Sequence, residues 1–325
     1  MHIGKLLTAL AVPVLLASPA TYAADAASNF PDKPIRLIIG SAAGSGPDII
    51  SRVLGERLYK TWGQRIVVDA RPGAAGLVSA ELAMRANPDG YTWMILTSQL
   101  FVATSVFEDL KFDLARDFQS ITLIGIVPFV QMVNPQLPAK SIPELIALAK
   151  KMPGKLRYGS AGTGASEHLS GVLFTHLTGT SMLHVPYKGI AQAIADTLSN
   201  EVQLTYGVMP AAYPHILGGR LRALGVTGPK RAPLLPDVPS ISESVPGYEM
   251  LGWYSAVAPT GTPTAILNKI SAEAVKAVKE PVFAEQLKSI GVEIVGGDRA
   301  ALDAWRRGQA KKIGDVVKVA GVTAK

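Results

Sequence analysis

The sequence predicts an α/β protein built from two doubly wound lobes that are joined by a hinge of two crossing segments. Three observations lead to this fold class. Short apolar segments alternate with segments of helical spacing along most of the chain. A unit made of an apolar segment, a glycine-rich turn and a helical segment occurs twice, and the alternation restarts about midway. Such alternation is typical of a mostly parallel sheet with helices on both faces.

The repeated unit covers residues 36–54 and again residues 156–174. A glycine loop between a strand and a helix leaves backbone N–H groups free at the positive end of the helix dipole, which favours an anion. Two such loops predict two lobes that face one anionic ligand. The corresponding tripeptides are Gly40-Ser41-Ala42 with Gly159-Ser160-Ala161, and Gly44-Ser45-Gly46 with Gly162-Thr163-Gly164.

In the first half of the chain, proline and turn residues mark where the elements begin and end. Pro47 suits the first turn of a helix, and the turn sequence Asn87-Pro88-Asp89-Gly90 ends another helix. Apolar runs between these signals read as strands. The pattern therefore predicts strands at 35–41, 65–71, 91–98 and 121–133, and helices at 47–60 and 77–85.

The second half begins with a capping signal, in which Ser141 is a candidate N-cap and Glu144 completes a capping box. The same spacing rules then continue to the end of the chain. They predict helices at 141–151, 166–178, 191–198, 263–278, 281–290 and 299–319, and extended segments at 155–160, 182–187, 202–208, 221–227 and 251–259.

Two extended segments would carry the chain between the lobes. The pattern restarts near Val127, and the segment 251–259 can bring the chain back. This predicts a first lobe of residues 28–126 plus 255–325 and a second lobe of residues 127–254. Two crossings form a hinge with a cleft that can close on a ligand. Both glycine loops follow strands at the edge where such sheets bind ligands.

Residues 1–23 have the pattern of a signal peptide. Lys5 supplies the positive charge, and residues 6–16 form the apolar stretch. Thr21 and Ala23 are the small residues that precede a cleavage site after Ala23, and cleavage after Ala26 is the alternative. The apolar stretch is shorter than the ~20 residues that span a membrane. The sequence therefore predicts export and a mature protein free in solution.

Composition excludes several classes of protein. The absence of cysteine removes disulfides, thiol catalysis and thiolate metal sites. The net charge of +7 comes from scattered basic residues, so we expect no nucleic-acid partner. His168 and His176 are two helical turns apart, and no group of histidines and acids has metal spacing, so no metal is expected.

Motifs for cofactors and for catalysis are also missing. A dinucleotide fingerprint would need glycine in place of Ile49, a P-loop would need Gly-Lys-Ser/Thr, and the spacing Gly-x-Ser-x-Gly does not occur. We therefore expect no cofactor and no enzyme activity.

Asp48 would repel an anion, and we expect it to support the helix start or to pair with Arg52. Hydroxyl groups near the strand ends and helix starts can either bind the ligand or cap helices; they belong to Ser41, Thr97, Ser98, Thr163 and Ser166.

From about Phe30 to Lys325 the chain resembles the solute-binding proteins of tripartite tricarboxylate transporters, the Bug family. The motifs FPDKPIRLII, NPDGYT, PGKLRYGSAGTGASEHLSG, HVPYKG and WYSAVAPTGTP carry the resemblance in the same order as in the family. The resemblance implies a two-lobed periplasmic binding protein fold of the type II kind. It also implies a small carboxylate held between the glycine loops through backbone N–H groups, hydroxyls and water.

On this resemblance, the ligand-binding positions lie on the two glycine loops and on polar residues close to them. The implied partners are membrane subunits of a tripartite tricarboxylate-type transporter, and the protein is expected to be a periplasmic monomer. Alternatives are a sensor that presents the bound form to a signalling protein, or an exported hydrolase or isomerase. The predicted ligand-binding residues are Ser41, Ala42, Ala43, Gly44, Ser45, Asp48, Thr97, Ser98, Ala161, Gly162, Thr163, Gly164, Ser166, Tyr187 and Tyr206.

One departure from the family concerns the charge of the ligand. Many members carry aspartates near the positions of Gln203 and Gly207, where this chain has no acid. An ammonium group would then lack a partner, and an unpaired buried charge is costly. The sequence therefore favours a mono-, di- or tricarboxylate without an amino group. An aromatic carboxylate could stack on Tyr206, Phe129 or Trp253.

Overall fold

The computed structural model describes residues 28–107, 109–288 and 290–321. The predicted signal peptide, residues 1–23, lies outside the described residues. The described strands are β1 Ile35–Ile39, β2 Ile66–Ala70, β3 Thr92–Thr97, β4 Phe118–Val133, β5 Arg157–Ser160, β6 Leu183–Pro186, β7 Leu204–Val208, β8 Arg222–Val226, β9 Leu251–Pro259 and β10 Glu293–Gly297.

The α-helices alternate with these strands, as the periodicity of the sequence predicts. Two short 3₁₀ helices, η1 Ala74–Gly76 and η2 Ile241–Glu243, lie in the connections. The α-helices are α2 Gly46–Trp62, α3 Leu77–Met84, α4 Ser98–Val106, α5 Leu114–Asp117, α6 Ile142–Lys151, α7 Ser166–Thr178, α8 Ile190–Leu198, α9 Met209–Leu217, α10 Thr264–Val278, α11 Pro281–Lys288 and α12 Arg299–Ala320.

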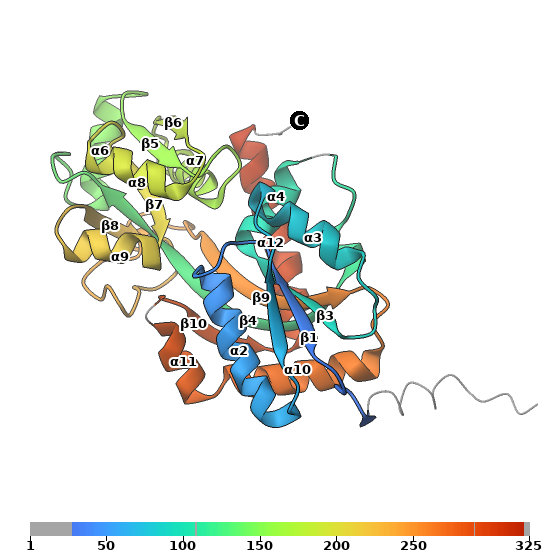
Figure 1. Ribbon diagram of the computed structural model, residues 1–325. Coiled ribbons are helices and arrows are strands. Elements are labelled where there is room, and N and C mark those ends of the chain that lie inside the picture. Colours follow the sequence, from blue (N-terminus) through green and yellow to red (C-terminus); the bar gives the residue numbers. More distant parts are fainter. Residues whose placement is uncertain (1–27, 108, 289, 322–325) are drawn as a thin grey trace, which may run out of the picture.

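The long strands β4 and β9 connect the two halves of the molecule (Figure 1). The part of β4 from Phe118 to Pro128 pairs with β9, whereas Phe129 to Val133 pair with β7. The strand order is β2-β1-β3-β9-β4-β7-β5-β6, with β10 and β8 also paired with β4. The lobe bounds expected at residues 126–127 and 254–255 stay a prediction.

The sheet is mixed rather than mostly parallel. β1 is parallel to β2 and β3, and β5 is parallel to β6 and β7. Every pair that involves β4 or β9 is antiparallel. β4 and β9 are antiparallel to each other because the chain crosses between the halves along β4 and returns along β9. Within each half, the parallel strands still place their carboxyl ends at one edge.

Most predicted elements lie within a few residues of the observed ones, but four were not expected. These are the helices α4, α5 and α9 and the strand β10. The capping box predicted at the start of α6 differs from the structure in the backbone N–H group that the Glu144 carboxylate binds. The Ser141 hydroxyl accepts a hydrogen bond from the Glu144 N–H, but the Glu144 carboxylate accepts from Lys140 N–H, at 2.8 Å. The N–H group that Glu144 binds is therefore one residue before the N-cap, and not that of the N-cap Ser141 itself.

The C-terminal helix α12 packs on both halves of the molecule. Near its start, Leu302 belongs to the buried cluster around Phe118 and Trp253. Near its end, Ile313 and Val316 belong to a second cluster around Phe174 and Tyr248. The sequence predicts that the residues of this helix belong to the first lobe. Its second half instead adds a third link between the two halves, beside α7 (Figure 1).

Candidate functional site

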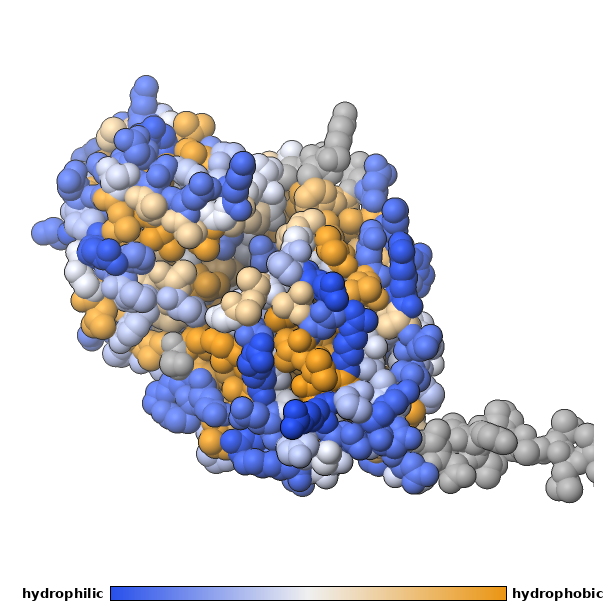
Figure 2. Space-filling view, viewed as in Figure 1, coloured by the Kyte–Doolittle hydropathy of each residue, from blue (hydrophilic) through white to orange (hydrophobic). Residues whose placement is uncertain are grey.

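A cavity of about 470 Å³ lies between the two halves of the molecule. Figure 2 shows a recess between the two masses, with apolar surface close to it. The cavity wall combines backbone at helix starts, small hydroxyl side chains and a few large side chains. It is lined by Gly40, Ser41, Ser45, Gly46, Pro47, Ala75, Gly76, Ser79, Ile95, Thr97, Ser98, Gln99, Leu100, Val127, Phe129, Ala161, Ser166, Glu167, Lys188, Gly189, Ile190, Val208, Gly252 and Tyr254.

Six of the described helices begin at this cavity. In α2, α3, α4, α8 and α9 the N-cap residue lines it, and in α7 the first two helical residues do. The first N–H groups of a helix have no intrahelical partner, and the positive end of the dipole lies there. Six such ends around one cavity create a positive potential that favours an anion. The N-cap residues that line the cavity are Ser45, Gly76, Thr97, Gly189 and Val208.

The first glycine loop is held closed by Asp48. The Asp48 carboxylate accepts a hydrogen bond from Gly44 N–H, at 2.9 Å, and from Arg52 Nε, at 3.0 Å. The hydrogen bond from Arg52 holds the pKa of Asp48 below its usual range, although burial acts against it. The expected pairing of Asp48 with Arg52 is confirmed. Ala42, Ala43, Gly44 and Asp48 shape the loop and do not line the cavity.

The second glycine loop uses its N–H groups internally as well. Gly162 N–H donates to Ser160 Oγ at 3.1 Å, and Gly164 N–H donates to His168 Nδ1 at 3.1 Å. Ser160 Oγ also lies 2.6 Å from His184 Nε2, within hydrogen-bond distance. Of this loop, only Ala161 lines the cavity, whereas Gly162, Thr163 and Gly164 do not.

Two histidines stack beneath this loop. The rings of His168 and His184 are 3.9 Å apart, and Tyr158 lies beside them. Burial lowers the pKa of each histidine to about 4, and for His184 the neighbouring His168 contributes further. Both rings are therefore neutral around pH 7. A neutral Nδ1 of His168 can accept the hydrogen bond from the loop, which fixes the loop against α7.

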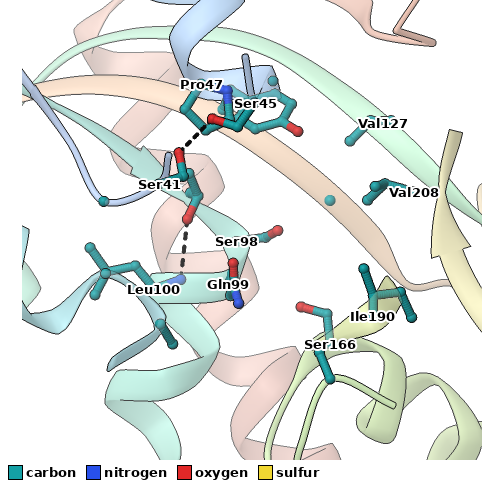
Figure 3. Close-up of a pocket in the computed structure, with 18 of the residues that line it drawn as sticks. Ser41, Ser45, Pro47, Ser98, Gln99, Leu100, Val127, Ser166, Ile190 and Val208 are labelled. Atoms are coloured by element: carbon teal, nitrogen blue, oxygen red, sulfur yellow. Dashed lines mark hydrogen bonds between the residues drawn. The ribbon is translucent and has the colours of Figure 1, made fainter. Parts of the chain in front are cut away.

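The hydroxyl groups at the cavity differ in what they bind. Ser41 and Ser45 bond each other at 2.8 Å, and Thr97 accepts from Leu100 N–H at 3.2 Å as the cap of α4 (Figure 3). Ser166 is only 4% exposed, and its hydroxyl has no hydrogen-bond partner among the described residues. Figure 3 shows this hydroxyl turned toward the side of the cavity where α4 begins. Buried hydroxyl groups normally form hydrogen bonds, so the Ser166 hydroxyl is a candidate to bond a ligand in the cavity.

The two predicted tyrosines lie away from the cavity. Tyr187 donates from its hydroxyl to Asp196 Oδ2 at 2.7 Å, and its ring packs against Gly159. Tyr206 is fully buried and accepts from Gln131 Nε2 at 2.7 Å. Trp253 is also a core residue and packs on Phe101. Of the proposed stacking residues, only Phe129 lines the cavity. Aromatic residues on these strands therefore serve mainly the core.

Sequence reasoning missed several side chains of the cavity wall, among them Gln99, Glu167, Lys188 and Tyr254. Gln99 was missed together with α4, and Tyr254 because β9 was treated only as a crossing segment. Glu167 follows Ser166 in the first turn of α7, which was a usable signal. Burial raises the pKa of Glu167 to about 7, with its own backbone N–H acting in the opposite direction.

Within the part of the chain that the structure describes, no group of three histidine, aspartate or glutamate residues is arranged to hold a metal ion. No helix among these same residues has the length and apolar character required to cross a membrane.

Fold and cavity together define a class: a two-lobed α/β binding protein with a cavity between its halves at which helix N-termini meet. The profile of the tripartite tricarboxylate transporter family receptor matches residues 50–322, so the chain belongs to this receptor family. The family is one of transporter receptors, and the neighbour BugD is a periplasmic binding protein, so the chain is a receptor and not an enzyme. The resemblance to the Bug family and the fold class are both confirmed.

Among curated relatives, a UPF0065 protein from the tcbD-tcbE intergenic region of Pseudomonas sp. strain P51 is 34% identical over 270 residues, covering 82% of this chain and 80% of the relative. Protein BugT of Bordetella pertussis is 30% identical over 90% of each chain. Among solved structures, R. palustris Rpa4515 with adipate is 32% identical with a TM-score of 0.81, covering 90% of this chain and 99% of its own. The periplasmic binding protein BugD is 31% identical with a TM-score of 0.77, and the match covers 91% of this chain and 100% of BugD.

Proposed function

We propose that this receptor captures a small carboxylate in the cavity and delivers it to membrane subunits of a tripartite tricarboxylate-type transporter. The observation that carries the proposal is the convergence of six helix N-termini on one cavity that also holds the unpartnered Ser166 hydroxyl. Backbone N–H groups at helix starts bind carboxylates as they bind phosphates. The exported, monomeric form without residues 1–23 and the lobe bounds given above belong to this proposal.

The cavity suits a small ligand with more than one polar end. Its volume of about 470 Å³ lies in the range of small-molecule sites. Hydroxyls and helix starts come from both halves, so a ligand that bridges them would stabilise the closed form. Lys188 adds a positive charge at the wall. A solved relative at 32% identity holds adipate, a dicarboxylate. These features support a mono-, di- or tricarboxylate as the class of ligand.

The test is a panel of ligands in a thermal-shift assay, followed by calorimetry. The panel contains succinate, adipate, benzoate, phthalate, aspartate and phenylalanine. A ligand at 100 times its Kd should stabilise the protein by about 2.7 kcal/mol through mass action. Recovery of the bound compound unchanged is expected for a receptor. Failure of every carboxylate to shift Tm would contradict the proposed function.

Ser166 provides the matched test of the site. We expect Ser166→Ala to weaken carboxylate binding by about tenfold, because it removes one hydrogen bond to a charged group worth about 1.5 kcal/mol. The control is Ser199→Ala, since Ser199 lies on the surface beyond α8 and bonds only a backbone carbonyl. Equal Kd values for Ser166→Ala and the wild type would remove Ser166 from the site.

A further inference from the structure

Glu167 is the one acidic residue among the described residues that line the cavity. It occupies the second position of α7, directly after the unpartnered Ser166. The residue is half-buried at the cavity wall, and no lysine or arginine of the described chain forms an ion pair with it. An acid in a cavity that otherwise favours anions requires an explanation.

Burial disfavours the charged form of an unpaired carboxyl group. This effect raises the pKa of Glu167 to about 7, and no nearby cation lowers it again. A ligand carboxylate bound in the same cavity would raise it further, because two like charges within a few ångströms cannot both ionise easily. Ligand and proton therefore favour each other in this site.

The other titratable groups around α7 do not respond in the same pH range. His168 on α7 and His184 on β6 have pKa values of about 4, and burial raises the pKa of Tyr158 on β5. Tyr254 on β9, across the cavity, has a pKa raised to about 12. Lys188, the one basic side chain among the described residues of the cavity wall, is exposed. Between pH 6 and 8, titration in the cavity therefore belongs to Glu167.

We propose that Glu167 contacts the bound ligand as a neutral carboxyl group and donates a hydrogen bond to one of its oxygens. Above neutral pH the receptor then takes up one proton from solvent together with the carboxylate. This makes Glu167 a specificity-determining residue, which favours ligands with a second acceptor oxygen, such as dicarboxylates, over ligands with an ammonium group. The inference rests on the proposed function, because it requires a carboxylate in the cavity.

The test is calorimetry with adipate from pH 5.5 to 9, in pairs of buffers with different ionisation enthalpies. For the wild type, Kd should rise by up to about tenfold per pH unit above pH 7, with proton uptake approaching one per ligand. In Glu167→Gln the amide can still donate, so Kd should be independent of pH and no proton should be taken up. Glu285→Gln, an exposed glutamate on α11, should behave as the wild type.

Thermal unfolding without ligand gives a second readout. A carboxyl group with a raised folded pKa contributes stability that is present below about pH 4.5 and is lost as pH rises through about 7. The Tm of Glu167→Gln relative to the wild type should therefore increase between pH 4.5 and 8, and that of Glu285→Gln should not. A constant difference would overturn the assignment of this titration to Glu167.

The remaining outcomes separate the two proposals. Adipate binding with a pH-independent Kd in the wild type would overturn the role of Glu167 and leave the receptor function intact. Aspartate binding that tightens as pH rises, and that is lost in Glu167→Gln, would show an ionised Glu167 paired with an ammonium group, which also overturns the inference. Failure of every carboxylate in the panel at all pH values would contradict both proposals.

Discussion

Gly164 and Gly44 show that a glycine in a binding loop can be required for a reason other than contact with the ligand. Both have positive φ angles, +79° and +80°. Their N–H groups bond inside the protein, and a Cβ on Gly164 would lie 2.8 Å from Val106 of α4. At Gly164 the backbone therefore approaches another part of the chain closely enough to leave no room for a side chain.

Substitution of these glycines should consequently affect stability. We expect Gly164→Ala to cost about 2–4 kcal/mol, because a left-handed backbone costs ~1–2 kcal/mol and the contact with Val106 adds overpacking. Gly44→Ala should cost only about 1 kcal/mol, since its Cβ would meet open space. Urea denaturation of each variant and of the wild type measures these losses in the free energy of unfolding. The control is Gly179→Ala at the end of α7, where φ is +60° and no atom lies within 4 Å of the added Cβ. Equal losses at Gly164 and Gly179 would show that Val106 does not matter.

Some cavity residues follow from local sequence and others do not. Ser41, Ser45 and Ser166 could be predicted because they stand beside a glycine loop at the end of a strand. Gln99 and Lys188 could not, since their place in the cavity depends on how distant elements pack. Backbone contacts within each loop were equally hidden, because which N–H groups stay free depends on Asp48 and His168.

At the scale of elements, the sequence predicted those with strong periodicity or clear capping residues. α7 and β9 have the predicted bounds. α4 was missed because its residues continue the apolar run of β3, and only the Thr97 cap marks the change. α9 was missed because Pro210 and Pro214 lie in it. β10 depends on pairing with β4, which short-range patterns cannot indicate.

The start of α12 gives a prediction for one element. Asp298 accepts a hydrogen bond from Ala301 N–H at 2.9 Å and caps this helix. Asp298→Ala should reduce the free energy of unfolding by about 1 kcal/mol, the usual cost of a lost N-cap. Asp298→Asn keeps a capping oxygen and should cost much less. Chemical denaturation of both variants tests this, and similar losses in the two would show that charge, and not the cap, is the larger contribution.

For the whole molecule, β4, β9 and α12 restrict how the two halves can move. Two strands paired over most of their length can bend together, while α12 packs on both halves beside α7. A ligand held by helix starts from both halves should shift the population toward a closed form. The expectation is a smaller radius of gyration in small-angle scattering with saturating adipate. An unchanged radius, with binding shown by calorimetry, would mean that the ligand enters without closure.

Recognition through helix starts has an evolutionary consequence. The groups that would hold the carboxylate belong largely to the main chain, which point mutations do not alter, so substitutions of neighbouring side chains should leave much of the anion site in place. A gene duplicate could therefore acquire a new nutrient through one or two exchanges at positions such as Gln99, Glu167 or Lys188. The same property makes these three positions the natural starting points for directed evolution of a receptor toward a chosen acid.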